Sequence, residues 1–334
     1  MKLSISVPDW ATHIVSDLTD MDRKAHPVDA RKVRSFTLEL PDDVYFEYAF
    51  LDASGTMRAD PERETRADSP WYGEVSAVYG PDYRADPYAE PGALPAGETK
   101  RMRLESRHLA QTRRLSLYTP RGFGGEPLPV VYVQDGVALY RYAKLHLVLE
   151  NLLRDGLVRP AHLAFLEPVE RTAEYGFNAS YRKFVLEEAL PEVERTLPVT
   201  GERVLLGASL GGLVSVLLAL DAPERFRSVA TFSGAFLGTP DDRDFYASKD
   251  SWVLDELRRR ERLPLRFYTE VGTLEWLTEV NRELAGVLDS RGYEHRYAER
   301  SAGHNWTSWK NGFRGALTFV LETQASAENA PEAG

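Results

Sequence analysis

The chain has 334 residues with no cysteine, 43% hydrophobic and 28% charged residues, and a formal net charge of −10. The lack of cysteine excludes disulfides, thiolate metal sites and a cysteine nucleophile. The acidic balance argues against a general nucleic-acid binder, which needs a basic face, and an anionic substrate would need a local cationic patch to overcome the overall field.

The length suggests two domains. No run of 18 apolar residues is present, so no transmembrane helix and no membrane partner are expected. The first residues, Met1–Asp9, lack the apolar core of a signal peptide. These features lead us to expect a cytoplasmic protein.

Residues 1–80 are predicted to form an all-β domain. Val33–Leu40 alternates apolar and polar residues, which is the period of a strand. Val44–Leu51 is rich in β-forming residues, and Gly73–Tyr79 is a further candidate strand. Short turn sequences separate these runs, so we predict a small β-sandwich.

This region resembles the immunoglobulin-like early-set domains that accompany carbohydrate-active and esterase domains. The resemblance is carried by Phe36–Pro41, Tyr45–Asp52 and Asp60–Pro61. It implies contact with a glycan or another substrate through exposed aromatic side chains such as Trp71 and Tyr72. The alternative, which we favour, is a structural cap on a catalytic domain.

Residues 81–97 are rich in proline and glycine and are predicted to be a linker. From 98 to 323, apolar strand patterns alternate with helical ones. The strands are expected at residues 101–106, 112–118, 129–133, 161–166, 204–206, 228–233, 265–270 and 295–299. The helices are expected at residues 139–154, 181–197 (interrupted near Pro191), 213–220, 250–260, 276–289 and 306–321.

Such alternation predicts an α/β domain with a doubly wound, mostly parallel sheet over residues 98–323. The last residues, 324–334, are rich in alanine and glutamate and are predicted to be a disordered tail.

The segment Gly207-x-Ser209-x-Gly211 lies between the short apolar strand and the apolar helix that follows it. This is the pattern of a nucleophile elbow, in which a sharp turn holds a serine in a strained backbone. The glycines are needed because side chains there would collide with the strand and the helix. We predict Ser209 as the nucleophile, with the backbone N–H of Leu210 as an oxyanion donor.

A serine nucleophile needs a histidine base and a carboxylate that orients it. Of the seven histidines, only His304 follows the last predicted strand; the others precede the hydrolase sheet or fall within predicted helices and strands. The acid should follow the strand 265–270, which leaves Glu275 or Glu270. We prefer Glu275, because it lies beyond the strand; a helix N-terminal acid is the alternative interpretation of this residue.

A second oxyanion donor is expected in the loop after strand 129–133. Gly136 in that loop permits close approach of the backbone, so we assign the N–H of Val137.

With these residues in place, the region from about 98 to 322 resembles the enterochelin (enterobactin) esterase family, in the esterase D group of α/β-hydrolases. The matching segments are Val130–Gly136, Arg171–Asn178, Gly207–Gly212, Pro223–Phe226, Phe232–Gly234, Gly272–Glu275 with Asn281 and Arg282, and Gly303–Trp306. The resemblance implies hydrolysis of ester or lactone bonds in a small-molecule substrate, a ferric catecholate siderophore, with release of iron. It implies neither a metal site nor an organic cofactor.

The same resemblance implies a substrate contact at Arg171, and we predict further substrate-binding positions at Glu174, Asn178 and Trp306. An arginine suits a trianionic ferric complex. The alternative for Arg171 and Glu174 is an ion pair between the two, and for Trp306 an anchor of the last helix. His304 is followed by Asn305, where the siderophore enzymes often have an aspartate.

The leading hypothesis is therefore a serine carboxylic-ester hydrolase that forms an acyl-enzyme. The wider group also includes feruloyl and acetylxylan esterases, S-formylglutathione hydrolases and mycolyltransferases, so a carbohydrate-ester hydrolase or another acyl-transfer enzyme is the second hypothesis. The third is a non-catalytic binding protein on a hydrolase fold. The serine, acid and histidine in hydrolase order argue against it.

Overall fold

The computed structural model describes residues 1–90, 92, 96–242, 244–248 and 250–323. It divides into two compact units. The first unit contains Met1–Ala85 together with two later segments, Val271–Glu279 and Glu299–Trp309. The second contains the rest of the chain. The tail predicted at 324–334, and part of the predicted linker, lie outside the described residues.

An eight-stranded sheet runs through the second unit in the order β16-β15-β14-β13-β11-β12-β10-β9. The pairings of β11, β12, β13, β14 and β15 are parallel, whereas β9 and β10 are antiparallel additions at one edge. The bounds are β9 Glu98–Ser106, β10 Gln111–Thr119, β11 Leu128–Val133, β12 His162–Leu166, β13 Val199–Ala208, β14 Ser228–Phe232, β15 Arg266–Gly272 and β16 Glu294–Arg300. The prediction of an α/β fold with a mostly parallel sheet is confirmed.

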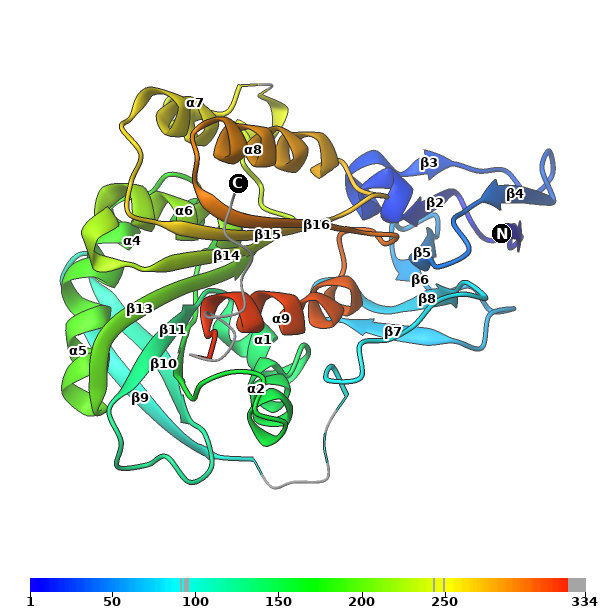
Figure 1. Cartoon of the computed structure of the whole chain (residues 1–334). Coiled ribbons are helices and arrows are strands. Elements are labelled where there is room, and N and C mark those ends of the chain that lie inside the picture. The colour runs from blue at the N-terminus through cyan, green and yellow to red at the C-terminus, as the bar shows by residue number, and fades with distance from the viewer. Residues whose placement is uncertain (91, 93–95, 243, 249, 324–334) are drawn as a thin grey trace. The chain divides into compact units, whose positions relative to one another are not determined.

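Helices cover both faces of this sheet, with α4, α6, α7 and α8 on one side and α1, α2 and α9 on the other (Figure 1). Their bounds are α1 Gly136–Arg141, α2 Leu145–Arg154, α3 Arg171–Tyr175, α4 Ala179–Lys183, α5 Leu190–Thr196, α6 Leu210–Asp221, α7 Trp252–Arg259, α8 Thr278–Ser290 and α9 Trp306–Val320. Short 3₁₀ turns occupy Asp17–Thr19, Met21–Lys24, Pro223–Arg225 and Phe245–Ala247.

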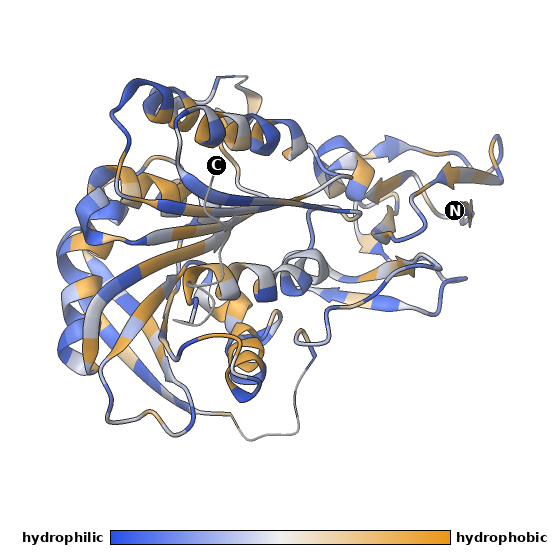
Figure 2. Ribbon diagram, viewed as in Figure 1, coloured by the Kyte–Doolittle hydropathy of each residue, from blue (hydrophilic) through white to orange (hydrophobic). Residues whose placement is uncertain are grey.

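The middle strands are apolar along their whole length because both of their faces are buried. Every residue of β11, β12 and β14 is buried, whereas β9 is made of exposed and half-buried residues up to its buried last residue, Ser106. Figure 2 shows the same contrast as orange strands in the middle of the sheet and a bluer strand at its lower left edge. Continuous apolar runs of this kind are typical of parallel strands between two helical layers.

Two predicted helices are divided in the structure. The helix expected at 139–154 is α1 and α2, separated at Lys144, which has a left-handed backbone (φ 53°). The apolar spacing is continuous across the break, which is why the pattern predicted one helix. The helix expected at 181–197 is α4, a π-helical turn at Phe184–Ala189, and α5. Pro191 lacks the N–H of a regular turn, so the helix widens before it.

In the described residues, the strands β1 to β8 of the first unit pair with one another antiparallel. β1 (Lys2–Ser6) pairs with β4 (Ser35–Glu39). A six-stranded sheet has the order β3-β2-β5-β8-β7, with β6 beside β5. Its strands are β2 His13–Ser16, β3 His26–Pro27, β5 Tyr45–Leu51, β6 Met57–Arg58, β7 Arg66–Ser69 and β8 Gly73–Tyr79.

The central strand of this sheet, β5, is buried on both faces. Phe46 and Phe50 pack into one apolar cluster, and Ala49, which points to the other face, packs into a second with Val15 and Val75. The aromatic and β-branched composition that predicted strands here therefore also supplies the core of the unit.

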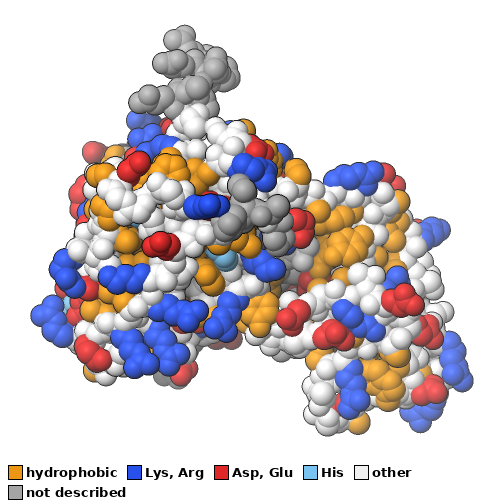
Figure 3. Space-filling model, turned by 90° about the horizontal axis from the view of Figure 1, so that it is seen from below, with side chains coloured by type: hydrophobic (Ala, Val, Ile, Leu, Met, Phe, Trp, Pro, Cys, Tyr) orange, Lys and Arg blue, Asp and Glu red, His pale blue; other side chains and the backbone are white. Residues whose placement is uncertain are grey.

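No helix of the described residues is long and apolar enough to cross a membrane. The face shown in Figure 3 carries charged side chains of both signs, with Lys and Arg side chains crowded in its lower left part. A chain with a net charge of −10 thus still presents areas of positive charge.

Candidate active site

Ser209 follows β13 directly and precedes the first residue of α6. Its backbone has φ 57° and ψ −123°, a conformation that side-chain-bearing residues rarely adopt. The surroundings hold it there: its N–H donates to Phe232 O at 2.8 Å, and its carbonyl accepts from Ala235 N at 3.1 Å. Strain at a buried serine between a strand and a helix is the local geometry of a nucleophile elbow.

A side chain has no room at Gly207, and one at Gly211 would be in tight contact with Asp135. A Cβ at Gly207 would lie 2.2 Å from Gly211 O, and one at Gly211 would lie 3.0 Å from Asp135 Oδ2. The backbone of the turn is therefore packed against itself and against the end of β11. The N–H of Leu210 belongs to the first residue of α6, where no residue of the helix can accept from it.

The N–H of Val137 is engaged by a carboxylate. It donates to Glu167 Oε2 at 2.6 Å. Burial raises the pKa of Glu167 above its ordinary value. This hydrogen bond and the nearby charges of Arg113 and Arg114 offset only part of that rise. The predicted oxyanion donor thus binds a carboxyl oxygen of the protein itself, and an ester carbonyl would have to replace it.

Arg171 ties together the ends of β11 and β13. Its Nε and Nη2 each lie 2.7 Å from one carboxylate oxygen of Asp135, and Nη2 also donates to Ala208 O at 3.3 Å. Asp135 has a left-handed backbone (φ 55°), and its N–H donates to the Tyr175 hydroxyl at 2.9 Å. Arg171 therefore supports the turns that carry Val137 and Ser209, and its contact with a substrate stays a prediction.

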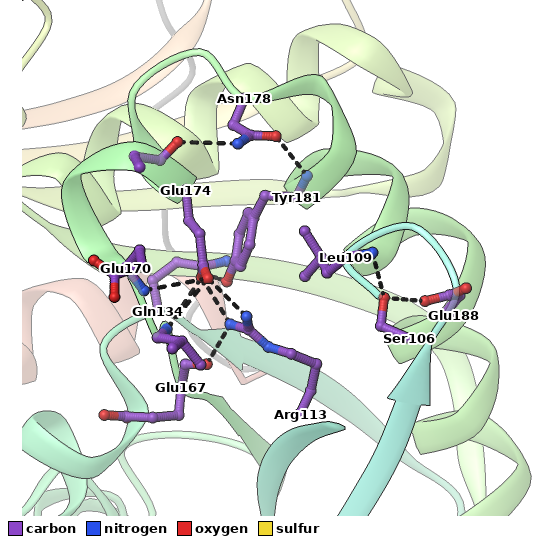
Figure 4. Close-up of polar contacts among 12 residues, drawn as sticks. Ser106, Leu109, Arg113, Gln134, Glu167, Glu170, Glu174, Asn178, Tyr181 and Glu188 are labelled. Atoms are coloured by element: carbon purple, nitrogen blue, oxygen red, sulfur yellow. Dashed lines mark hydrogen bonds and ion pairs between the residues drawn. The ribbon is translucent and has the colours of Figure 1, made fainter. Parts of the chain in front are cut away.

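Glu174 is held in a buried ion pair with Arg113, as Figure 4 shows. Arg113 Nη1 and Nη2 each lie 2.7 Å from one of its oxygens, and the N–H of Val169 donates to the same carboxylate. The alternative of an Arg171–Glu174 pair is replaced by two separate pairs, because β10 brings Arg113 under α3. A role of Glu174 in substrate binding has no support from this geometry.

Asn178 caps α4. Its Oδ1 accepts from Tyr181 N at 3.0 Å, and its Nδ2 donates to Ala173 O at 3.0 Å (Figure 4). Both polar atoms of the Asn178 side chain thus bond to nearby backbone at the start of α4. Substrate contact by Asn178 also stays a prediction.

His304 and Glu275 are brought together in the first unit. His304 Nδ1 lies 2.5 Å from Glu275 Oε2, and the Glu275 side chain is fully buried. The other oxygen of Glu275 accepts from Gly272 N at 2.8 Å, which fixes the carboxylate at the end of β15. A buried carboxylate on Nδ1 leaves Nε2 as the nitrogen that can exchange a proton with a hydroxyl.

Glu270, the other acid considered, lies within β15 in the second unit. It accepts a hydrogen bond from the Tyr268 hydroxyl at 2.6 Å, and a Cβ at Gly312 would lie 2.5 Å from it. The side chain is thus packed against α9.

Tryptophans surround the imidazole of His304. Trp276 lies 4.5 Å and Trp309 5.0 Å from it between ring centroids, and Trp71 is stacked at 6.3 Å with an interplanar angle of 22°. Trp306 is buried and packs on Trp71 at 4.9 Å. Trp306 therefore contributes to the wall around the histidine, and its contact with a substrate stays a prediction.

Buried polar residues of the N-terminal strands hold the loop that carries His304. Asp17 accepts from Asn305 Nδ2 at 3.3 Å and from Glu47 N at 2.7 Å. A Cβ at Gly303 would lie 2.1 Å from Asp17 Cγ, which explains the glycine before the histidine. The N–H of Tyr45, the first residue of β5, donates to Ser301 O at 2.9 Å, so this strand is also hydrogen-bonded to the loop that carries His304.

Sequence reasoning missed Asp17, Glu47, Arg113 and Glu167. Each lies far along the chain from the residue it supports, and no local motif marks it. An acidic residue beside a predicted strand end, as at Glu167, was the only available signal. Within the described part of the chain, no group of three or more His, Asp or Glu side chains is arranged to hold a metal ion.

Comparisons with known proteins agree with these features. The model of the Esterase family, described as "Putative esterase", matches residues 106–320. The iron(III) enterobactin esterase of Dickeya dadantii is 28% identical over 287 residues, which cover 79% of this chain and 65% of that protein. The iron(III) salmochelin esterase of Escherichia coli is 26% identical, over 62% of this chain and 53% of that protein. The chain thus spans less than two thirds of the length of these two relatives.

Solved structures share the fold. The ferric enterobactin esterase of Salmonella typhimurium superposes with a TM-score of 0.77 at 20% identity, over 96% of this chain and 92% of that one. A ferulic acid esterase from Anaeromyces mucronatus gives a TM-score of 0.59 at 16% identity, over 70% of this chain and 95% of that one. The resemblance to an esterase family that was identified from the motifs is confirmed. Because the family model matches well over half of its residues, the chain belongs to the Esterase family.

Proposed function

We propose that this protein is a serine carboxylic-ester hydrolase with Ser209, His304 and Glu275 as its triad. The observation that carries the proposal is the strained backbone of Ser209, enclosed between Gly207 and Gly211. Strain of this size persists only where the surrounding structure enforces it, and it is concentrated at catalytic turns. The hydrogen bond between His304 and Glu275 supports the other two roles.

In the first half of the reaction, Ser209 Oγ attacks the ester carbonyl carbon while its proton passes to His304 Nε2. The carbonyl oxygen becomes an oxyanion stabilised by the N–H groups of Leu210 and Val137. The C–O bond to the alcohol then breaks, and the alkoxide takes the proton from His304. The product is an acyl-enzyme on Ser209 and a free alcohol.

In the second half, water attacks the acyl-enzyme and gives its proton to His304. The new oxyanion collapses, the bond to Ser209 Oγ breaks, and the serine recovers the proton. Glu275 stays ionised throughout and stabilises the imidazolium at each step. Neither half needs a metal or an organic cofactor.

The substrates that we propose are the ester or lactone bonds of catecholate siderophores. Two observations support this choice over a ferulate ester. The D. dadantii relative, named an iron(III) enterobactin esterase, aligns with 79% of this chain. Enterobactin esterase structures cover 96% of it, whereas the ferulic acid esterase structures cover 68% and 70%.

We further propose that residues 1–80 form an immunoglobulin-like domain that acts as a structural cap, with 81–97 as a linker and 98–323 as the catalytic domain. The contacts of Asp17 and Tyr45 with the loop of His304 support this role. In this view, the N-terminal strands help to hold the catalytic histidine.

The test is labelling with a fluorophosphonate, read by intact mass, together with hydrolysis of 4-nitrophenyl butyrate. Wild type should gain one adduct and turn over the ester, and Ser209→Ala should do neither while its thermal midpoint is unchanged. Ferric enterobactin and methyl ferulate then separate the two substrate classes. A folded wild type that neither labels nor hydrolyses any ester would overturn the proposal.

A further inference from the structure

A cavity of about 410 Å³ opens in the second unit beside the predicted oxyanion donor. Its walls come from β9, β10, α1 and the end of β12 with the residue that follows it. Both Val137 and Glu167, joined by their short hydrogen bond, belong to the lining. The size falls within the usual range for small-molecule sites, which is about 300–1,000 Å³.

The charge of the lining is strongly positive. Arg101, Arg103, Arg114 and Arg141 face the cavity, and Glu167 is the acidic residue of its wall. Within the described residues, none of these four guanidinium groups makes a hydrogen bond or an ion pair. Arginines elsewhere in the unit behave differently: Arg113, Arg171 and Arg203, for example, each form a two-pronged pair with a carboxylate.

The strand register concentrates this charge on one face of the sheet. Arg103 lies directly opposite Arg114 in the antiparallel pair of β9 and β10, and Arg101 is two residues away on the same face. Like charges that face each other across two strands destabilise the pair. In a chain with a net charge of −10, these exposed arginines form a local area of positive charge.

At the edge of the cavity, the Glu167 carboxyl group already occupies the Val137 N–H. The carboxylate bonds to the Val137 N–H at 2.6 Å, and the charge of Arg114 acts on it. Because Val137 itself lines the cavity, an ester whose carbonyl displaced Glu167 from the Val137 N–H would lie at its edge. The four arginines of the lining would then be the nearest cationic groups of the cavity to that ester.

We propose that this cavity binds a carboxylate-type oxyanion on the acyl part of the ester, so that the enzyme prefers acyl groups that end in a negative charge. The inference rests on the proposed ester hydrolysis, and it concerns the charge of the acyl part rather than the siderophore substrates proposed above. Guanidinium groups suit this role because they stay charged and present paired N–H donors to planar oxyanions.

The experiment compares two esters that differ in one charge: the mono-4-nitrophenyl ester of adipic acid and its neutral methyl ester. Wild type should hydrolyse the anionic ester with a kcat/KM about fivefold higher than that of the neutral one. The double variant Arg103→Gln/Arg114→Gln should lose about tenfold on the anionic ester and less than about twofold on the neutral ester.

The matched control is Lys100→Gln/Arg121→Gln. It removes the same number of positive charges from exposed positions near the same strands but outside the cavity lining. This variant should keep the wild-type preference. An equal loss in the control, or an unchanged preference in the cavity variant, would overturn the inference.

A binding measurement separates this inference from the proposed function. Monomethyl adipate, which is a monoanion, should bind to wild type in titration calorimetry and bind about tenfold more weakly to the cavity variant. If wild type hydrolyses neither ester, the proposed function fails while the calorimetry still decides the anion site. If it hydrolyses both esters equally and binds no monomethyl adipate, only the anion site fails.

Discussion

At the scale of single residues, the site depends on which group each polar atom meets. Glu275 meets His304 Nδ1 at 2.5 Å, whereas Glu270 meets the Tyr268 hydroxyl at 2.6 Å. In the sequence, Glu270 ends the predicted strand and Glu275 lies just beyond it, but only Glu275 makes the contact that fixes an imidazole tautomer. Their different partners make them separable by substitution.

Glu275→Gln should lower kcat for 4-nitrophenyl butyrate by about 10²- to 10⁴-fold, because an amide can neither select the tautomer nor stabilise the imidazolium. Glu270→Gln keeps an acceptor for Tyr268 and should change kcat by less than about threefold. Steady-state kinetics of both purified variants checks this. The reverse order of the two effects would assign the role to Glu270.

Glu167→Ala should raise kcat/KM for a neutral ester by about three- to tenfold, since the Val137 N–H is then released from its carboxyl partner. The gain should lie mostly in KM. Glu170→Ala is the control, because Glu170 is an exposed carboxylate nearby on the same segment. A fall in kcat at constant KM would instead show that Glu167 orients the Val137 turn.

At the scale of elements, a buried ion pair connects β10 to α3. Arg113 is almost wholly buried, it contacts Glu174 through two nitrogens, and Nη2 also donates to Glu167 O at 2.8 Å. The guanidinium therefore reaches two segments on the carboxyl side of β12. Because burying both charges costs desolvation free energy, the pair adds little net stability. Its contribution becomes measurable when one partner is removed and the other charge stays buried and unpaired.

Glu174→Gln should lower the free energy of unfolding by about 2–4 kcal/mol, because it leaves the Arg113 charge buried without its counter-ion. Arg113→Met/Glu174→Gln should recover at least half of the loss, since the unpaired charge is gone. Urea unfolding followed by tryptophan fluorescence gives both values. A double variant less stable than Glu174→Gln would contradict this explanation.

At the scale of the whole molecule, the first unit joins segments that are distant in the chain. Residues 1–85 fold together with 271–279 and 299–309, so the loops of Glu275 and His304 share a core with the N-terminal strands. The connection includes two buried acids, Asp17 and Glu47. Burial raises the pKa of Glu47 to about 7, and it raises that of Asp17 well above its usual range.

These raised pKa values predict a pH dependence of stability. An acid whose pKa is higher in the folded state binds protons more tightly there, so its stabilising effect is full below about pH 4.5 and is lost as the pH rises through about 7. Wild type should therefore lose about 2–3 kcal/mol relative to Glu47→Gln between pH 5 and pH 8. Thermal unfolding of the two proteins across this range measures the difference, and parallel curves would contradict the prediction.

The sequence by itself determined the local features of this protein. The alternation of strands and helices, the glycines around Ser209, and the place of His304 after the last strand all follow from patterns a few residues long, because backbone period and steric room are local properties. Only the tertiary structure decided the partners. Strand order places Arg113 on Glu174, Asp135 on Arg171 and Glu167 on the Val137 N–H, and it collects unpaired arginines from β9, β10 and α1 around one cavity. Ion pairs and cavities form between segments far apart in the chain, so no short motif carries them.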